Sequence, residues 1–258
     1  MIKFTIITCT YNAERVLLRT LDSVKKQTYC NIEHIIMDGG SSDKTLPMVR
    51  AYQHKIIKGE NAHDIVVVSE PDRGLYDAMN KSIDRATGDY LVFLNAGDVF
   101  PSGETLEYVA GCVGEGETLP GVLYGDTDIV DASGHFLRHR RLQPPARLSW
   151  RSFRWGMLVC HQSFYARTDL AKAIHYNLSY RYSADVDWCI RIMKEAASRH
   201  LPLRNVGAVI THYLDGGMSV QNHRASLRER FHVMRTHYGL LVTLFVHAWF
   251  VVRGIVKK

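Results

Sequence analysis

The sequence predicts an α/β fold in which a mostly parallel sheet is covered on both faces by helices. Short apolar, β-branched segments alternate with amphipathic segments through the first hundred residues. Polar, glycine-containing loops fall where the apolar segments end. The chain has 258 residues, of which 46% are hydrophobic and 22% charged, so it is long enough to bury a substantial core. Continuous apolar strands that alternate with helices are typical of a parallel sheet buried on both sides.

The predicted elements follow one another in the order strand, helix. A strand over 3–8 precedes a helix over 13–27, which carries Val16, Leu17, Leu21 and Val24 at helical spacing. Further strands are expected at 32–37, 64–69 and 90–94, a helix after the caps at 41–43, and a helix over 75–87 that Gly88 ends. This order is typical of Rossmann-like sheets, which bind ligands beyond the carboxyl ends of their strands.

The second half of the chain predicts a more varied set of elements. A helix is expected at 104–109, then a hairpin about Ser133-Gly134, a basic and aromatic stretch over 142–167 without a clear period, a helix that follows YSADVDW, and a strand over 203–213.

Four polar loops follow the four strands of the first half: TCTYN (8–12), DGGSSD (38–43), EPDRG (70–74) and NAGD (95–98). They converge on one rim of the predicted sheet, as a nucleotide site requires. No GxGxxG or GxxxxGK[ST] follows the first strand, which disfavours the usual dinucleotide and P-loop sites. Asn, Asp and Gly are also ordinary turn formers, an alternative that suits one loop better than four.

Cysteine usage and charge restrict the compartment and the partners. The five cysteines form no CxxC, which disfavours a disulfide framework or a zinc ribbon and fits a reducing compartment. The initial run KFTIIT is too short for a signal peptide, so a cytoplasmic location is expected. A net charge of +6 and a pI near 9.0 favour nucleic acid, anionic lipid or a phosphorylated substrate as partner.

Five motifs together resemble the family 2 glycosyltransferases with the GT-A fold, and within them bacterial enzymes of the colanic-acid type. They are TIITCTYN, IIMDGGSSDKT, SEPDRGLYDAMNKSIDRATGDYLVFLNAGD, CHQSFYAR and GGMS, in family order between residue 2 and about residue 220. The resemblance implies an inverting transfer of a sugar from a nucleoside diphosphate to a lipid-linked saccharide in surface polysaccharide biosynthesis. It implies a nucleotide-sugar half at 1–102, an acceptor half at 103–220 and a helical tail at 221–258.

The resemblance also implies a set of donor-binding residues. They are Thr8, Tyr11, Asn12, Asp38, Asp72, Arg73, Asp77, Asn80, Asn95, His161 and Gln162. Asp38 is expected to accept the imide N–H of uracil; guanine would also suit an aspartate, so UDP is favoured and GDP possible. Arg73 can pair with a phosphate through its bidentate fork. Asp77 and Asn80 share a helix face, where a helix N-terminal acid and a solvated amide are the alternative roles.

Asp98 is the expected metal ligand. It aligns with the last aspartate of the family's acidic strand-end motif, and Mn²⁺ or Mg²⁺ would neutralise the leaving diphosphate there. Asn95 and Gly97 stand where further carboxylates are common, so the metal should bind weakly without donor and well with it. The alternative is a strand-ending turn.

Asp185 is the expected catalytic base. Inverting transfer needs one group that takes the proton of the acceptor hydroxyl, and the family uses an aspartate at the start of a helix. Asp187 is the reserve candidate, although it points about 200° away once the helix has begun. Asp185 can also serve as a helix cap. His212, at a strand end, is left open as a contact to metal or diphosphate, and the GGMS segment resembles a loop that closes over the donor.

Two segments point to an anionic partner. Six arginines and two tryptophans between residues 138 and 155 could meet a phosphorylated acceptor, with nucleic acid or a solvated loop as alternatives. The apolar segment 239–252 is shorter than the roughly twenty residues that span a bilayer. Peripheral binding to the anionic inner face of the cell membrane is expected, and packing on the protein's own core or in a homodimer is the equal alternative.

Two other functions are weighed. A non-catalytic nucleotide-sugar or nucleic-acid binder would keep the fold with reduced acidic motifs. A nucleotidyltransferase is disfavoured because TCTYNAERV lacks the basic, glycine-rich signature expected near its N-terminus. No nucleic acid is expected as a partner under the leading hypothesis.

Overall fold

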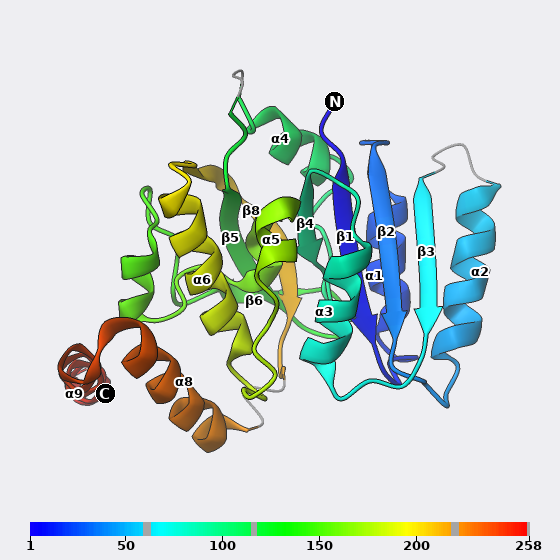
Figure 1. Ribbon diagram of the computed structural model, residues 1–258. Coiled ribbons are helices and arrows are strands. Elements are labelled where there is room, and N and C mark those ends of the chain that lie inside the picture. Colours follow the sequence, from blue (N-terminus) through cyan, green and yellow to red (C-terminus); the bar gives the residue numbers. More distant parts are fainter. Residues whose placement is uncertain (59–62, 115–117, 218–221, 257–258) are drawn as a thin grey trace.

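The computed structural model describes residues 1–58, 63–114, 118–217 and 222–256. Helices cover both faces of one eight-stranded sheet, whose strand order is β3-β2-β1-β4-β7-β5-β6, with β8 paired to β5 (Figure 1). The strands are β1 (Phe4–Thr10), β2 (Ile32–Asp38), β3 (Asp64–Ser69), β4 (Tyr90–Phe93), β5 (Val122–Val130), β6 (Phe136–His139), β7 (Phe164–Arg167) and β8 (Leu203–Leu214). The α/β fold predicted from the sequence, a mostly parallel sheet covered on both faces by helices, is confirmed.

The helices follow the predicted order. They are α1 (Leu17–Lys25), α2 (Thr45–Ile57), α3 (Leu75–Arg85), α4 (Thr105–Gly111), α5 (Thr168–Ala173), α6 (Ala184–Ser198), α8 (His223–Tyr238) and α9 (Leu240–Val256), with short 3₁₀ helices η1 (Trp150–Trp155) and η2 (His161–Ser163). The basic stretch without a clear period thus contains η1 and η2 and ends in β7.

The first half of the sheet is parallel and buried on both faces. β1 pairs in parallel with β2 and β4, and every residue of these three strands is buried. Ile7 and Ile35 lie on the face covered by α3 and α6, whereas Ile36 packs against Leu17 and Val49 from α1 and α2. β-branched residues suit this doubly buried position. The strand ends of β1 to β4 therefore form one rim.

The second half of the sheet extends this rim with strands from later in the chain. β7 is antiparallel to both β4 and β5, and β5 forms the predicted hairpin with β6. β8 runs parallel to β5, so its end at Leu214 lies at the same rim as the β4 loop. The backbone of His212 pairs there with Val99. Residues 218–221, which include the last two residues of the GGMS segment, lie outside the described residues.

The C-terminal helices lie to one side of the sheet. α8 packs against α6, and α9 contacts α8 and η1 (Figure 1). Thr243 and Val246 of α9 are buried, but Leu241 and Phe245 remain 82% and 68% exposed. No helix of the described part of the chain is long and apolar enough to cross a membrane.

Candidate active site

The polar loops of the first half are joined to one another through their backbones. Gly39 N donates to Thr10 O at 2.9 Å, which joins the ends of β1 and β2, and Glu70 N donates to Asp38 O at 3.0 Å, which joins the ends of β2 and β3. Parallel strands necessarily end on the same side, so the loops after them form a continuous rim.

Asn12 connects the first two loops through its side chain. It adopts a left-handed conformation with φ of 47°, which asparagine tolerates better than most residues. Its Oδ1 accepts the N–H of Ser42 at 2.9 Å, and its own N–H donates to the hydroxyl of Ser41. Asn12 therefore shapes the loop, while the neighbouring Tyr11 ring stays 65% exposed.

β1 continues two residues beyond its predicted end, which changes the environment of Thr8. Thr8 is fully buried, and its hydroxyl contacts His34 and the carbonyl of Leu94. Thr10 is the threonine at the end of the strand. Its Oγ1 is buried and has no hydrogen-bond partner among the described residues, which leaves it available to a ligand.

The EPDRG loop is held at the N-terminus of α3. Asp72 Oδ1 accepts the N–H of Gly74 at 2.7 Å, and Asp77 accepts both the backbone N–H and the guanidinium of Arg73 at 3.1 Å. The side chain of Arg73 is nevertheless 79% exposed, so most of its donors face solvent. Asp77 is thus a loop anchor, and Arg73 is free to meet an anion.

Asn80 binds the segment that precedes α6. Its Oδ1 accepts the N–H of Tyr176 at 2.7 Å and its Nδ2 donates to the carbonyl of the same residue at 3.0 Å. The ring of Tyr176 stacks between Tyr76 and Trp188. Asn80 therefore positions the chain that leads to Asp185.

One chain of contacts joins the β4 loop to the start of α6. His161 lies between Asn95 and Asp185: its Nε2 is 3.4 Å from Asn95 Nδ2, and its Nδ1 is 3.4 Å from Asp185 Oδ2. The hydroxyl of Tyr76 lies 3.4 Å from the other oxygen of Asp185. Asn95 Oδ1 is buried without a partner among the described residues. Asn95, His161 and Asp185, all predicted site residues, thus line one site, in which Asn95 Oδ1 is an unused hydrogen-bond acceptor.

Asp98 lies beside this chain, deep in the rim. Gly97, at φ of 102°, forms the turn before it, and a Cβ there would lie 2.6 Å from Leu214. Asp98 accepts hydrogen bonds from Leu214 N and Gln162 Nε2, both at 3.0 Å. Burial raises the pKa of Asp98 to about 6, although these hydrogen bonds and the charges of His161 and Arg19 act in the opposite direction.

The donor set around Asp98 fits a cation that brings other ligands with it. Each oxygen of Asp98 accepts one N–H and keeps a second lone pair. Asn95 adds its unused Oδ1 on the same loop. Within the described ranges, no cluster of three or more His, Cys, Asp or Glu could hold a metal ion. Diphosphate and water would therefore have to supply most ligands of Mn²⁺ or Mg²⁺.

Asp185 is charged at neutral pH. Burial alone would raise its pKa, but the hydrogen bond and charge of His161, the charge of Arg230 and the Val186 N–H outweigh burial, so its pKa lies below the usual value. Arg230 comes from α8, and its Nε is buried without a hydrogen-bond partner among the described residues. An ionised carboxylate near neutral pH is what a general base requires.

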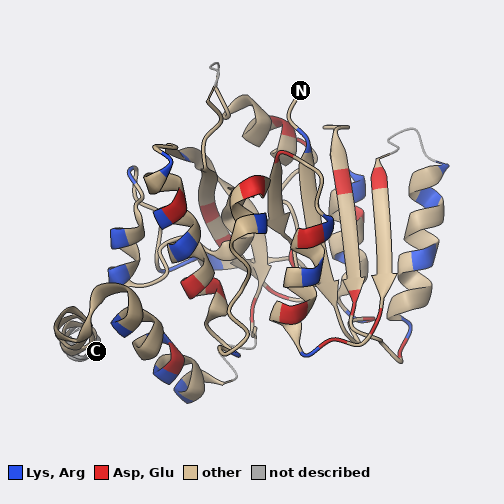
Figure 2. Ribbon diagram, in the orientation of Figure 1, with Lys and Arg blue, Asp and Glu red and all other residues tan. Residues whose placement is uncertain are grey.

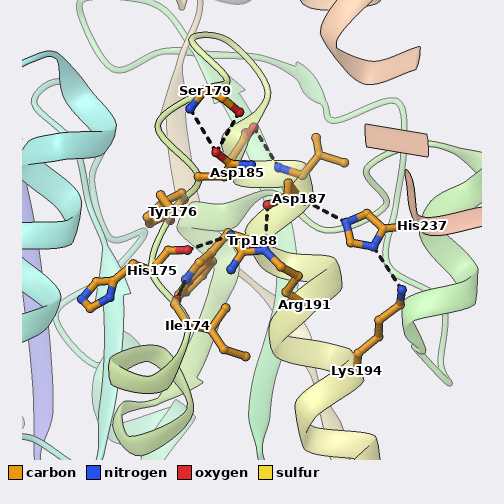
Figure 3. A network of polar contacts seen from close by, with 12 residues as sticks. Ile174, His175, Tyr176, Ser179, Asp185, Asp187, Trp188, Arg191, Lys194 and His237 are labelled. Atoms are coloured by element: carbon orange, nitrogen blue, oxygen red, sulfur yellow. Dashed lines mark hydrogen bonds and ion pairs between the residues drawn. The ribbon is translucent and has the colours of Figure 1, made fainter. Parts of the chain in front are cut away.

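Asp187, the reserve base, faces α8 and not the rim. It accepts Arg191 Nε at 2.7 Å and His237 Nε2 at 2.8 Å, and Lys194 Nζ contacts the other nitrogen of His237 at 3.0 Å (Figure 3). Only 5% of the Asp187 side chain is exposed. The contacts of Asp187 with Arg191 and His237 form the Asp187 latch, which holds α8 against α6, the helix that carries Asp185.

The structure separates the predicted residues into three groups. The first group contains two sets of contacts, which neighbouring residues of η2 bring together: Asn95–His161–Asp185 and Asp98–Gln162. The second group forms or anchors the loops at the ends of β1 to β3: Tyr11, Asn12, Asp38, Asp72, Arg73 and Asp77. In the third group, Thr8 and Asn80 bind protein groups. Sequence reasoning missed Thr10, Tyr76 and Arg230. Thr10 and Tyr76 lie in quoted motifs, whereas no local pattern marked Arg230 as a site residue.

Comparison with known proteins identifies the family. The model of "Glycosyl transferase family 2" matches residues 5–173, well over half of the chain. The chain belongs to glycosyltransferase family 2. The enzyme is 34% identical over 249 residues to a PGL/p-HBAD biosynthesis glycosyltransferase of Mycobacterium bovis, which covers 95% of this chain and 90% of the relative. It is 28% identical to the amylovoran biosynthesis glycosyltransferase AmsB of Erwinia amylovora over 75% of this chain and 64% of the relative.

Solved structures share the fold of this glycosyltransferase. TarS 1–349 of S. aureus in complex with UDP-GlcNAc gives a TM-score of 0.70 at 19% identity, covering 91% of this chain and 65% of TarS. Glucosyl-3-phosphoglycerate synthase of Mycobacterium tuberculosis, in complex with Mn²⁺, UDP and glucosyl-3-phosphoglycerate, gives 0.62 at 15% identity, covering 93% and 81%. The enzyme thus has the GT-A fold of these glycosyltransferases.

Proposed function

We propose that the enzyme transfers a sugar, with inversion, from a nucleoside diphosphate to a lipid-linked saccharide acceptor in surface polysaccharide biosynthesis. The observation that carries the proposal is the chain of contacts from Asn95 through His161 to the partly buried, ionised Asp185. This arrangement supports a base and sugar-binding acceptors at the rim of strand ends, where sheets of this kind bind ligands. UDP is the favoured nucleotide, in line with the UDP-GlcNAc in the TarS complex.

Asp185 acts as the base in this proposal. Its carboxylate takes the proton of the acceptor hydroxyl as that oxygen attacks the anomeric carbon, from the face opposite the leaving diphosphate. The Nδ1–H of His161 and the hydroxyl of Tyr76 hold the carboxylate in place. The first half of the chain, 1–102, binds the donor, and 103–220 presents the acceptor.

The leaving diphosphate is bound by the enzyme's own side chains as well as by a cation. A bound Mn²⁺ or Mg²⁺ would neutralise the diphosphate. Asp98 and the free Oδ1 of Asn95 would hold that ion or its water. The exposed guanidinium of Arg73 binds a phosphate through its bidentate fork.

The charge distribution supports a membrane-bound acceptor. Residues 132–168 and 230–258 contain 7 and 5 of the 32 lysines and arginines and none of the 26 acids. These segments sum to +12, and since the whole chain carries +6, the remainder carries −6. Figure 2 shows basic residues along α8 beside the nearly uncharged α9. Such an asymmetric charge distribution favours binding to an anionic surface.

The exposed side of α9 supplies the apolar part of this surface. A groove of about 400 Å³ runs between η1 and α9; it is lined by Arg154, Trp155, Leu241, Val242, Phe245 and Val246. An apolar helix face with cationic neighbours is the arrangement of interfacial membrane helices. We therefore propose peripheral attachment to an anionic membrane, which would bring the lipid-linked acceptor to Asp185.

Two measurements test these proposals. A thermal-shift screen of nucleotide sugars with and without Mn²⁺ should show a shift with one donor class, because a ligand of the native state raises apparent stability. No shift with any donor contradicts the glycosyltransferase site, and a shift without any turnover favours a non-catalytic binder.

Flotation with anionic liposomes tests the membrane attachment, and it should fail for the double variant Leu241→Ser/Phe245→Ser. Unchanged flotation of this variant rules out α9 as anchor, and a dimer that it disrupts would favour the homodimer alternative.

A further inference from the structure

One face of α8 packs against the start of α6, at the rim end of the molecule (Figure 1). Ser226 and Val233 lie two turns apart on this face, and both are buried. The hydroxyl of Ser183, which immediately precedes α6, donates to the carbonyl of Ser226 at 3.2 Å. Arg230 comes four residues after Ser226 and three before Val233, and therefore lies on the same face. Its side chain leaves α8 toward the helical turn that carries Asp185.

Glu229, the neighbour of Arg230, fixes the chain that leads into α6. Its two carboxylate oxygens accept the backbone N–H groups of Arg181 and Tyr182, at 2.9 Å and 2.7 Å. Hydrogen bonds to an ionised carboxylate are among the stronger ones in proteins. The backbone of Arg230 is therefore held in a defined place relative to Asp185.

The guanidinium of Arg230 is a charge without a partner. The side chain is half-buried, and it forms neither a hydrogen bond nor an ion pair with any residue that the structure describes. On the facing turn, Asp185 pairs with His161 and Asp187 pairs with Arg191. The start of α6 does not compensate the charge either, because the N-terminus of a helix is itself partly positive. A partly buried charge of this kind is costly unless a ligand pairs with it.

The ligand on this side of the base is the acceptor. In an inverting transfer the acceptor hydroxyl and its base lie on the face of the anomeric carbon opposite the leaving diphosphate. Arg230 lies near the base, and its charge helps to lower the pKa of Asp185. The planar fork of a guanidinium matches the two oxygens of a carboxylate or phosphate, whereas a neutral sugar would leave the charge uncompensated. An anionic group on the acceptor therefore suits this position.

We propose that Arg230 binds the acceptor, by pairing with a carboxylate or phosphate group close to the hydroxyl that Asp185 deprotonates. This inference rests on the proposed function and names the chemical class of its acceptor, an acidic or phosphorylated saccharide. The anion at Arg230 is distinct from the diphosphate of the donor, which Arg73 meets at the start of α3.

Calorimetric titration of the full chain, loaded with UDP and Mn²⁺, tests the inference with three probes. They are methyl glucoside, which is neutral, methyl glucuronide, which carries a carboxylate, and glucose 1-phosphate. At least one anionic probe should bind about 10- to 100-fold more tightly than methyl glucoside, the range for hydrogen bonds to a charged group. Tighter binding of the glucuronide indicates an acidic sugar in the acceptor, and tighter binding of the phosphate indicates a phosphorylated one.

Variants of α8 assign this preference to one side chain. Arg230→Gln and Arg230→Met remove the charge and should abolish the preference for an anion, with UDP affinity within about twofold of the wild type. Arg228→Gln is the matched control, because Arg228 is an exposed arginine about 200° around the same helix. It should leave the preference unchanged.

Three results overturn the inference: equal binding of all three probes to the wild type, a preference for an anion that survives in both Arg230 variants, and loss of UDP binding in both. The second result would mean that Arg230 acts only on Asp185, and the third would assign Arg230 to the stability of the fold. A wild type that binds UDP but no probe overturns the inference and leaves the glycosyltransferase proposal intact. A wild type that does not bind UDP contradicts both.

Discussion

The Nδ1 atom of His161 lies 3.4 Å from Asp185 Oδ2, and the Nε2 atom of the same ring lies 3.4 Å from the amide nitrogen of Asn95. The Nδ1–H group of the ring donates to Asp185, and Nε2 faces the amide group of Asn95. The side chains of both His161 and Asp185 are largely buried, at 10% and 18% exposure. One ring thus joins the end of β4 to the first turn of α6.

His161→Ala should lower kcat about tenfold or more and leave donor affinity nearly unchanged. The substitution removes the hydrogen bond and charge that lower the pKa of Asp185, so this pKa should rise and the acidic limb of the rate profile should move to higher pH. The measurement is a pH profile of kcat. His175→Ala, whose ring contacts the exposed Asp84, is the control. A profile identical to that of the wild type would show that His161 does not position the base.

Asp98→Asn should abolish the metal dependence of donor binding. The amide can keep the hydrogen bond from Leu214, but it cannot supply a charged ligand. Titration with UDP, with and without Mn²⁺, should show enhancement by metal in the wild type and none in the variant. The donor-free wild type should bind Mn²⁺ weakly because Asp98 is the one carboxylate of the β4 loop. Tight metal binding by the donor-free protein would mean that the ligands lie elsewhere.

Asp187→Asn should destabilise the enzyme by about 2 kcal/mol at pH 7, as expected for lost hydrogen bonds to a buried charge. Burial alone would raise the pKa of Asp187, but His237 and Arg191 outweigh burial and lower it. A carboxyl with a lowered pKa contributes its full stability above the unfolded-state pKa of about 3.9, and loses it as the pH falls through the native-state pKa.

The free energy of unfolding, measured by urea titration, should therefore differ most between variant and wild type above pH 5 and converge below pH 4. Asp84→Asn, in an exposed pair with His175, should change stability by less than about 0.5 kcal/mol. A difference that persists unchanged at low pH would show that the Asp187–His237 contact is not an ionic latch.

Local patterns predicted most elements of the fold. Continuous apolar runs located β2 and β3 almost to the residue, and Ser133-Gly134 located the hairpin. β1 ran on to Thr10 because TCT is as buried as the apolar residues before it. Polar residues inside a doubly buried strand resemble a strand end in sequence, which is why Thr8 was expected at the rim.

The site was harder to predict wherever partners are distant in sequence. The polar loop after β4 predicted Asn95 and Asp98 as site residues, and the start of α6 predicted Asp185. Arg230 follows them by more than forty residues and reaches the site through the packing of α8 against α6, to which the Asp187–His237 contact is one contributor. The proximity of Gly39 to Asp72 likewise depends on how two loops pack, which no local pattern encodes.

The rate of sugar transfer by Asp185→Asn tests the central claim most directly. Labelled UDP-sugar is followed into a bacterial lipid extract that supplies lipid-linked acceptor, with UDP affinity measured in parallel and Asp187→Asn as the control on the same helical turn. We expect Asp185→Asn to bind UDP within about twofold of the wild type while transfer falls about 10²- to 10⁴-fold, the usual contribution of a general base. Asp187→Asn should keep most of the rate. Transfer by Asp185→Asn at the wild-type rate would contradict the assignment of Asp185 as the base.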